Sequence, residues 1–190
     1  MCGLLGMLAA TGNVDKYVDA LERSLPCMRH RGPDAAGTWH DGDAAFGFNR
    51  LSIIDLEHSH QPLRWGPEDQ PDRYAMTFNG EIYNYVELRE ELKGLGYTFH
   101  TEGDGEPIVV GYHHWGKDVV NHLRGMFGIV IWDTHTKTMF AARDQFGIKP
   151  LYYATTPAGT VFASEMKCIL EMADEIGLEL NLDPVSYTHL

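Results

Sequence analysis

The sequence predicts an α+β fold in a single domain, and three observations lead to that prediction. The chain has 190 residues, of which 44% are hydrophobic, so it can bury one sizeable core. Apolar residues recur at helical spacing in several segments before residue 127, whereas short apolar runs separated by polar turns follow it. Several of these runs are apolar on both faces, which favours two sheets packed face to face with helices outside.

The first third of the chain predicts a strand, a helix and a second strand. The largely apolar start, residues 1–12, is typical of a buried strand. A helix with Asn13 as its N-cap follows, because apolar residues recur at helical spacing at Val14, Tyr17, Val18, Leu21, Leu25 and Met28. The chain turns around residues 30–37, and the stretch DAAFGFNRLSIID, residues 43–55, predicts the next strand.

The middle of the chain predicts one strand and three helices. A polar loop runs from about Gln61 to Arg73, before the strand YAMTFNGEIYN. The helix that follows ends at residues 94–96, and its apolar face comprises Tyr85, Leu88, Leu92 and Leu95. Asp104 can cap the next helix, which carries Ile108, Val109, Tyr112 and Trp115. A short last helix would carry Val119, Leu123 and Met126.

From residue 126 the sequence predicts a series of short strands. Their sequences are MFGIVIWD, TMFAARD, KPLYYATT and TVFASEM, and each is separated from the next by a polar turn. Successive strands joined in this way pair as antiparallel hairpins.

The charge balance excludes two classes of partner. The chain has 27 acidic and 15 basic residues, a net charge of −12, and no basic run. Nucleic acids and anionic membrane surfaces attract cationic patches, so neither is an expected partner.

Cysteine usage and the start of the chain indicate a cytoplasmic protein. Cys2, Cys27 and Cys168 are odd in number and far apart, which argues against a disulfide scaffold or a thiolate metal site. The first cation, Lys16, lies beyond the apolar start, so the basic region of a signal peptide is missing. The histidine pairs at residues 58–60 and 113–114 lack a third ligand at a recognisable spacing, so no metal is expected.

Cys2 has two interpretations. If Met1 is removed, the residue carries both a thiol and a free α-amine. An α-amine has a pKa of about 7.7 to 8.0 and can accept the thiol proton, so Cys2 would be a nucleophile with its own base. A buried cysteine that packs as a small hydrophobic residue is the alternative.

The Asn79–Gly80 step, at the end of a predicted strand, is the second candidate feature. A side-chain amide and a backbone N–H that point the same way can hold the negative oxygen of a tetrahedral intermediate. Asn-Gly is equally common in hairpin turns. The residues that follow, 81–84, lead into a predicted helix and not into the returning strand of a hairpin.

Three charged residues complete the candidate site. Arg50 lies in a mostly apolar strand, so its guanidinium needs an anionic partner, which either the protein or a ligand carboxylate can supply. Glu81 and Asp104 could hold an ammonium group, although helix capping and a solvated surface are the alternatives for them. Together with a thiol and an oxyanion hole, these charges suit an amino-acid amide.

Six motifs occur in the order found in class II glutamine amidotransferases: MCGLLGM, MRHRGPD, FNRLSIID, FNGEIYN, RDQFGIKPLYY and ASEMK. Over residues 1–182 the chain resembles that family, and specifically the N-terminal glutaminase domain of glutamine-hydrolysing asparagine synthetase. The RHRGPD and SEMK forms favour this branch over amidotransferases that form phosphoribosylamine or glucosamine phosphate. The resemblance implies a four-layer αββα sandwich of the N-terminal-nucleophile hydrolase type, with mainly antiparallel sheets.

The resemblance also implies roles for individual residues. Cys2 matches the nucleophile that attacks the glutamine side-chain amide, releases ammonia and forms a thioester that water hydrolyses. Asn79 and Gly80 match the oxyanion hole, and Arg50 matches the residue that grips the substrate α-carboxylate. Glu81 and Asp104 match residues near the α-ammonium group. The pocket would also be lined by the backbone of Leu51, Ser52, Ile53 and Ile54, and residues 30–34 resemble the loop beside the nucleophile.

The ATP-binding half of asparagine synthetase has no counterpart in the sequence. Neither its Ser-Gly-Gly-x-Asp-Ser loop nor a P-loop occurs. We therefore expect a glutaminase domain at residues 1–182, followed at 183–190 by the start of a linker or a non-native tail. The glutaminase domain needs no cofactor, and ATP and Mg are expected only with the absent synthetase domain.

The expected partners are L-glutamine and the protein's own C-terminal synthetase domain, and a second copy of the protein, in a homodimer, is a further candidate partner. The ammonia would serve the ATP-dependent conversion of aspartate to asparagine in the full-length protein. Two alternatives remain. The domain could be the glutaminase half of another amidotransferase, which the acceptor domain would reveal. It could also be a module that binds glutamine without turnover, although the combination of Cys2, Asn79 and Gly80 argues against this.

Overall fold

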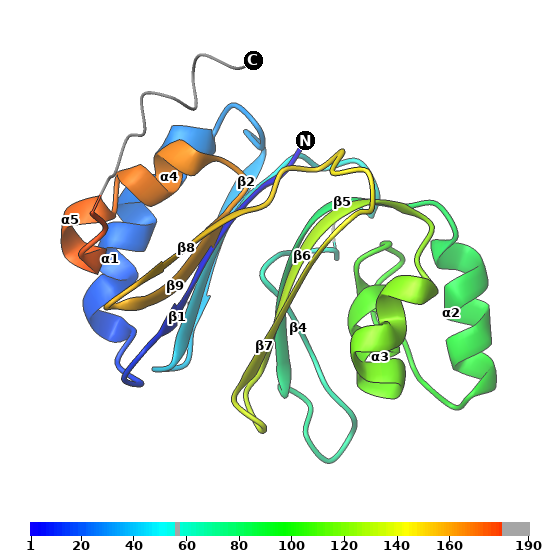
Figure 1. Cartoon of the computed structure of the whole chain (residues 1–190). Helices are drawn as coiled ribbons and strands as arrows, with labels where there is room; N and C mark the ends of the chain where they lie inside the picture. The colour runs from blue at the N-terminus through cyan, green and yellow to red at the C-terminus, as the bar shows by residue number, and fades with distance from the viewer. Residues whose placement is uncertain (56–57, 180–190) are drawn as a thin grey trace.

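Four layers make up the fold. The computed structural model describes residues 1–55 and 58–179. Two antiparallel sheets lie face to face and helices cover the outer face of each, so the layers are α, β, β and α (Figure 1). This arrangement confirms the αββα sandwich. The predicted boundary at residue 182 and the tail at 183–190 lie outside the described residues.

Sheet A has five strands in the order β2-β3-β1-β9-β8. Their bounds are β1 Gly3–Ala9, β2 Ala35–His40, β3 Ala44–Arg50, β8 Tyr152–Thr156 and β9 Gly159–Ala163. The central strand, β1, pairs with β3 and β9, so that Gly3 lies opposite Asn49. The N-terminus therefore leaves the middle of the sheet beside the last residues of β3.

Sheet B has four strands in the order β4-β5-β6-β7. Their bounds are β4 Leu63–Trp65, β5 Tyr74–Ile82, β6 Gly125–Asp133 and β7 Thr138–Arg143. β5 and β6 pair along their whole length, from Tyr74 opposite Asp133 to Ile82 opposite Gly125. This long ladder fixes the end of β5 at the same end of the sandwich as the N-terminus (Figure 1).

The helices form the two outer layers. Sheet A is covered by α1 Asp15–Ser24, the 3₁₀ helix η1 Leu25–Met28, α4 Met166–Leu170 and α5 Ala173–Ile176. Sheet B is covered by α2 Tyr85–Gly94, α3 Glu106–Trp115 and the 3₁₀ helix η2 Gly116–Asn121. Within the part of the chain that the structure describes, none of the helices is long and apolar enough to cross a membrane.

The middle strands are apolar on both faces because they belong to two cores at once. On β1, Leu5 packs beneath the helices, whereas Leu4 packs between the sheets. On β6, Ile131 faces the helices, whereas Trp132 faces sheet A. Successive side chains of a strand point to opposite faces, so each strand can serve both cores. The core between the sheets comprises Leu4, Ala44, Phe46, Phe48, Ala75, Val130 and Trp132.

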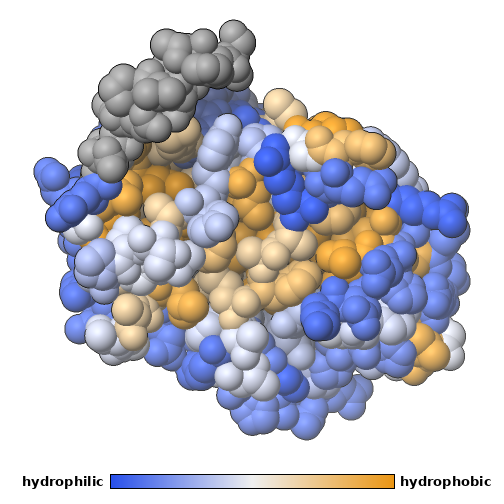
Figure 2. All heavy atoms as spheres, in the orientation of Figure 1, coloured by the Kyte–Doolittle hydropathy of each residue, from blue (hydrophilic) through white to orange (hydrophobic). Residues whose placement is uncertain are grey.

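Along one side of the sandwich the edge strands β7 and β8 leave an apolar groove. It has a volume of about 460 Å³, and Leu151, Tyr153 and Phe162 are among its lining residues. Figure 2 shows apolar residues along the middle of this face, between the two halves of the molecule.

Several predicted elements differ from the structure. Two strands were missed: β2 falls partly in the predicted turn, and β4 lies within the predicted polar loop. β3 ends at Arg50, so residues 51–55 are not strand. Met126 belongs to β6 and not to a helix.

The two predicted N-caps are also wrong. The cap position of α1 is Val14, and no side chain caps the helix, so Asn13 stands one residue too early. The cap position of α3 is Gly105, and the Asp104 carboxylate instead accepts a hydrogen bond from the backbone N–H of Ile82, at 3.0 Å.

Candidate active site

A pocket of about 330 Å³ lies where the ends of β1 and β3 meet the end of β5. This volume is in the range of small-molecule sites. Of the residues singled out in the sequence, the pocket is lined by Cys2, Arg50, Leu51, Ile53, Ile54, Asn79, Gly80, Glu81 and Asp104. The structure thus brings together residues that are up to a hundred positions apart in the chain.

Cys2 immediately precedes β1 and is partly buried. Its sulfur accepts a hydrogen bond from the backbone N–H of Leu51, with the nitrogen and sulfur 3.4 Å apart, and the carbonyl oxygen of Leu51 lies 3.5 Å away. Burial raises the pKa of the thiol, while the Leu51 N–H, the N-terminal amine and Arg50 oppose that increase. The surroundings therefore fix the sulfur in place but leave its deprotonation to a nearby base.

Arg50 is the last residue of β3 and is only 7% exposed. Its Nη2 donates hydrogen bonds to the backbone carbonyl oxygens of Asp55, at 2.6 Å, and Ile54, at 3.5 Å. The loop after β3 thus folds back over the guanidinium and orients it in the pocket.

Asp55 holds this loop in shape. Although burial alone would raise the pKa of its carboxyl, hydrogen bonds from the backbone N–H groups of Glu102 and His58 and from the side chains of His58 and Ser59 lower it to about 2. The residue has a positive φ of 47°, a conformation that aspartate tolerates better than most residues. The carboxylate therefore joins the Arg50 loop to the segment that contains Asp104.

Asn79 projects from β5 into the space between the sheets and is 1% exposed. Among the described residues, its Nδ2 is one of the few buried side-chain atoms without a hydrogen-bond partner. A buried amide donor without a partner costs about 1–3 kcal/mol, so its retention in a pocket wall calls for a ligand that accepts from it.

The backbone N–H of Gly80 is directed away from β6. Gly80 lies opposite Phe127 in the ladder between β5 and β6. The backbone N–H and C=O of Phe127 are both hydrogen-bonded to Asp144, so Gly80 and Phe127 share no hydrogen bond with each other. The backbone groups of Gly80 therefore face the side of β5 on which the pocket lies. A Cβ atom at Gly80 would come within 2.2 Å of the Met126 carbonyl oxygen, so only glycine fits here.

Gln61 fixes the end of β5 from the other side, and the sequence did not indicate it. Its side-chain amide accepts from the backbone N–H of Phe78 at 2.6 Å and donates to the Phe78 carbonyl oxygen at 3.0 Å. It thus extends the sheet by a side chain next to Asn79. The other lining residues that the sequence analysis missed are Met1, Ser59, Phe78, Met126 and Lys149.

Asp104 and Glu81 give the pocket an acidic wall. Burial raises the pKa of the Asp104 carboxyl, the Ile82 N–H lowers it, and the neighbouring Glu81 raises it. A cationic group of a ligand would stabilise the ionised form. Their position at the pocket, opposite in charge to Arg50, suits a zwitterion.

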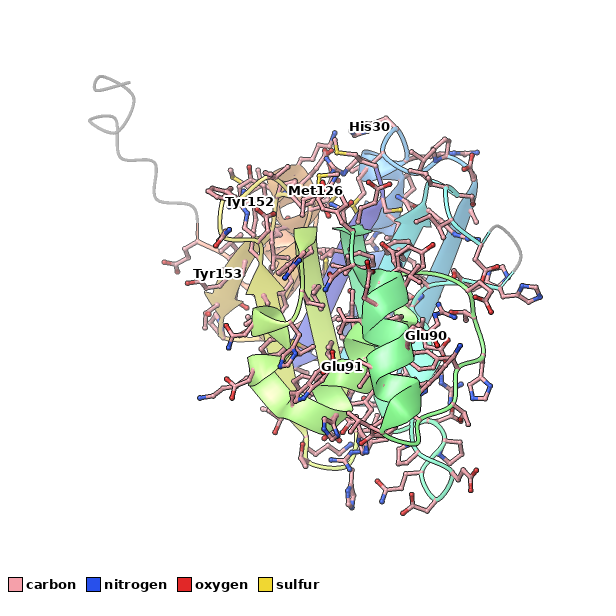
Figure 3. All side chains as sticks on the ribbon, turned by 90° about the vertical axis from the view of Figure 1, so that its right-hand side faces the viewer. His30, Glu90, Glu91, Met126, Tyr152 and Tyr153 are labelled. Atoms are coloured by element: carbon pink, nitrogen blue, oxygen red, sulfur yellow. The ribbon has the colours of Figure 1, made fainter. Side chains whose placement is uncertain are left out.

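Ser52 is the one predicted pocket residue that does not line the pocket. Its backbone N–H donates to the Asp34 carboxylate at 2.8 Å instead, which ties the loop after β3 to the 30–34 loop. Figure 3 shows His30, from that loop, at the same end of the molecule as Met126. Among residues 1–55 and 58–179, no three His, Cys, Asp or Glu side chains are grouped as a metal site would require.

Residues 1–188 match the glutamine amidotransferase domain family. The chain belongs to this family. A Mycobacterium tuberculosis protein, provisionally named as a glutamine-hydrolysing asparagine synthetase, is 53% identical over 200 residues, which cover 100% of this chain and 31% of that protein. The glutamine-hydrolysing asparagine synthetase 1 of Bacillus subtilis is 42% identical over 94% of this amidotransferase domain and 28% of its own length. The chain thus spans about a third of the length of these curated relatives.

Solved structures show the same fold. Glutamine phosphoribosylpyrophosphate amidotransferase from B. subtilis, complexed with ADP and GMP, has a TM-score of 0.68 and 22% identity over 93% of this chain and 44% of its own. A structure described as the allosteric regulatory enzyme of purine biosynthesis has a TM-score of 0.73 and 21% identity, over 93% of this chain and 43% of its own. These likenesses confirm the amidotransferase type of sandwich.

Proposed function

We propose that this amidotransferase domain hydrolyses L-glutamine to glutamate and ammonia, with the Cys2 sulfur as the nucleophile. The observation that carries the proposal is the pocket itself. It unites the thiol with a buried, unpartnered amide donor on Asn79 and with charges of both signs, Arg50 and Asp104. Family membership supports the same chemistry.

The reaction begins with the thiol. After Met1 is removed, the α-amine of Cys2 accepts the thiol proton, and the sulfur attacks the side-chain carbonyl carbon of glutamine. The carbonyl oxygen becomes an oxyanion, which accepts hydrogen bonds from Asn79 Nδ2 and the Gly80 N–H. The C–N bond then breaks as the protonated α-amine returns its proton to the leaving nitrogen, so ammonia departs. Water attacks the resulting thioester, which releases glutamate and the thiol.

Substrate recognition uses the charged walls. The Arg50 guanidinium would hold the α-carboxylate, and Asp104 with Glu81 would hold the α-ammonium group. The pairing of these opposite charges around the pocket selects a free amino acid over a neutral amide.

The greater length and the names of the relatives support a proposal for the partners of the full-length protein. In the full-length protein, the ammonia would serve the ATP-dependent conversion of aspartate to asparagine by a C-terminal synthetase domain. ATP and Mg would bind that domain, whereas the glutaminase domain itself needs no cofactor. We further propose a cytoplasmic protein, given the acidic composition and the three free cysteines. A homodimer is a further candidate assembly.

The test is ammonia release from glutamine. Cys2→Ala should bind glutamine, as seen by calorimetry, but release no ammonia, and Cys2→Ser should be nearly as inactive because an alkoxide is far harder to form than a thiolate. Cys27→Ser, which alters a half-buried cysteine outside the pocket, is the matched control and should retain activity. The intact mass of active protein should show that Met1 is absent. Turnover by Cys2→Ala, or full activity with Met1 retained, would contradict the proposal.

A further inference from the structure

Glu165 gathers basic side chains beside the nucleophile. It follows β9 and precedes α4, and its Oε1 lies 2.8 Å from His30 Nε2 and 3.3 Å from Arg31 Nη1. Its Oε2 lies 2.9 Å from Lys167 Nζ. The carboxylate therefore joins the ASEMK motif to the RHRGPD motif, neither of which lines the pocket.

Arg31 connects this cluster to Cys2. Its Nε donates to the backbone carbonyl oxygen of Cys2 at 3.0 Å, while its Nη1 points to Glu165. Glu165 is itself fixed to β1, because the neighbouring Ser164 accepts a hydrogen bond from the Leu4 N–H and donates its own N–H to the Leu4 carbonyl oxygen. Arg31 thus holds the carbonyl group of Cys2, while Ser164, at the end of β9, holds Leu4 two residues further along β1.

The contact between Arg31 and Glu165 differs from the contacts that His30 and Lys167 make with the same carboxylate. The side chains of His30 and Lys167 are 58% and 51% exposed, and contacts between a carboxylate and such exposed basic groups contribute little to stability. Arg31 is 10% exposed and its Nη2 is buried without a hydrogen-bond partner among the described residues. A guanidinium in this setting depends on its carboxylate for orientation as well as for charge.

We propose that Glu165 is a positioning residue for the Cys2 nucleophile, acting through the planar guanidinium of Arg31. The inference rests on the proposed function, since it assigns Cys2 the catalytic sulfur. Without the carboxylate, Arg31 would lose the contact that aligns its Nε with the Cys2 carbonyl oxygen. The sulfur and the α-amine would then shift relative to the oxyanion hole, and small displacements of this kind slow a reaction strongly.

The experiment compares Glu165→Gln with two controls in steady-state ammonia release. Glu165→Gln keeps the shape of the side chain, and we expect kcat to fall about tenfold or more while the KM for glutamine stays within about twofold, because Arg50 and Asp104 are untouched. Lys167→Met removes an exposed partner of the same carboxylate, and Glu175→Gln removes an exposed pair with Arg23. Both controls should retain the wild-type kcat.

A second variant tests the route through Arg31. Arg31→Lys keeps the positive charge and loses the planar fork. In the double variant Arg31→Lys with Glu165→Gln, kcat should be no lower than in the less active of the two single variants. The reason is that both changes break the same link between Glu165 and Cys2. The rate at which iodoacetamide alkylates Cys2, measured by peptide mass spectrometry, should fall in the same variants and requires no turnover.

The outcomes separate the two proposals. Wild-type protein that releases no ammonia would overturn the proposed function, and the alkylation rates would still test the positioning of Cys2. An active wild type with unchanged kcat and unchanged alkylation in Glu165→Gln would overturn the positioning role alone. Additive effects of the two substitutions would show that Glu165 does not act through Arg31. If Glu165→Gln does not fold, Arg31→Lys still tests the proposal: unchanged kcat and unchanged alkylation of Cys2 in that variant would overturn it, because the proposed route runs through Arg31.

Discussion

The two sheets contribute to the site in opposite ways. At the end of sheet A, the Cys2 sulfur and the Arg50 guanidinium have partners within the chain: the sulfur accepts from the Leu51 N–H, and Arg50 donates to the carbonyl oxygens of its own loop. At the end of sheet B, β5 presents Asn79, whose Nδ2 is buried and has no partner among the described residues. Thr77, two residues earlier on the same face of β5, has a buried hydroxyl oxygen that also lacks a hydrogen-bond partner among the described residues.

This difference suggests how one pocket can both bind a substrate and promote its chemical reaction. In the proposed mechanism, hydrogen bonds between the end of sheet A and the loop after β3 fix the nucleophile and the carboxylate anchor before substrate arrives, which lowers the cost of binding. In the same mechanism, the unpartnered donor on sheet B costs stability in the free protein and would find its acceptor only when negative charge develops on the substrate. In this account Arg50, on sheet A, would act mainly in binding, and Asn79, on sheet B, would act mainly in the chemical step.

Of the two residues compared, Asn79 and Arg50, the larger effect is expected for Asn79→Ala. Without its amide, the oxyanion loses one donor, and kcat should fall by roughly a hundredfold or more with a smaller change in KM. The melting temperature should stay the same or rise, because no hydrogen bond within the protein is lost. Kinetics and thermal denaturation of one preparation measure both. A variant that loses stability but keeps kcat would place the donor role elsewhere.

Arg50→Ala should give a smaller effect of the other kind. Loss of a charge-assisted pair with the α-carboxylate should raise KM by about tenfold or more, since such bonds contribute about 1.5 to 3 kcal/mol, while kcat changes less. The melting temperature should drop, because the loop at residues 54–55 loses its hydrogen bonds to the guanidinium. Arg50→Lys should recover only part of the KM, since an ammonium group lacks the planar fork. An unchanged KM in Arg50→Ala would remove Arg50 from substrate binding.

Much of the fold could be predicted because its strands carry strong apolar patterns. β5 and β6 are long and apolar on both faces, and they became the centre of sheet B. β2 was missed because its sequence, AAGTWH, begins with small residues and lies exposed at the edge of sheet A. β4 was missed because only Leu63 and Trp65 are buried in a stretch that is otherwise polar.

The candidate site could be predicted where a residue type implies chemistry. Cys2, Arg50 and Asn79 stood out as a thiol, a cation in an apolar strand and an amide at a strand end, and the structure places all three at one pocket. Gln61 could not be predicted, since its side chain acts only by pairing with the backbone of Phe78 across a fold not visible in the sequence. Ser52 was assigned to the pocket because the family resemblance implied the backbone of residues 51–54, but the loop after β3 directs the Ser52 backbone N–H to Asp34.

The most direct test of the account is covalent capture of the nucleophile. The diazoketone analogue of L-glutamine carries an electrophilic carbon in place of the amide nitrogen, and the three free cysteines compete for it within one chain. Burial raises the pKa of all three thiols, that of Cys168 to about 12, but of the three only Cys2 lines the pocket in which the analogue binds. Peptide mass spectrometry should therefore find the label on Cys2 alone, with L-glutamine protecting against it. Labelling of Cys27 or Cys168 as fast as Cys2, or no protection by glutamine, would contradict the account.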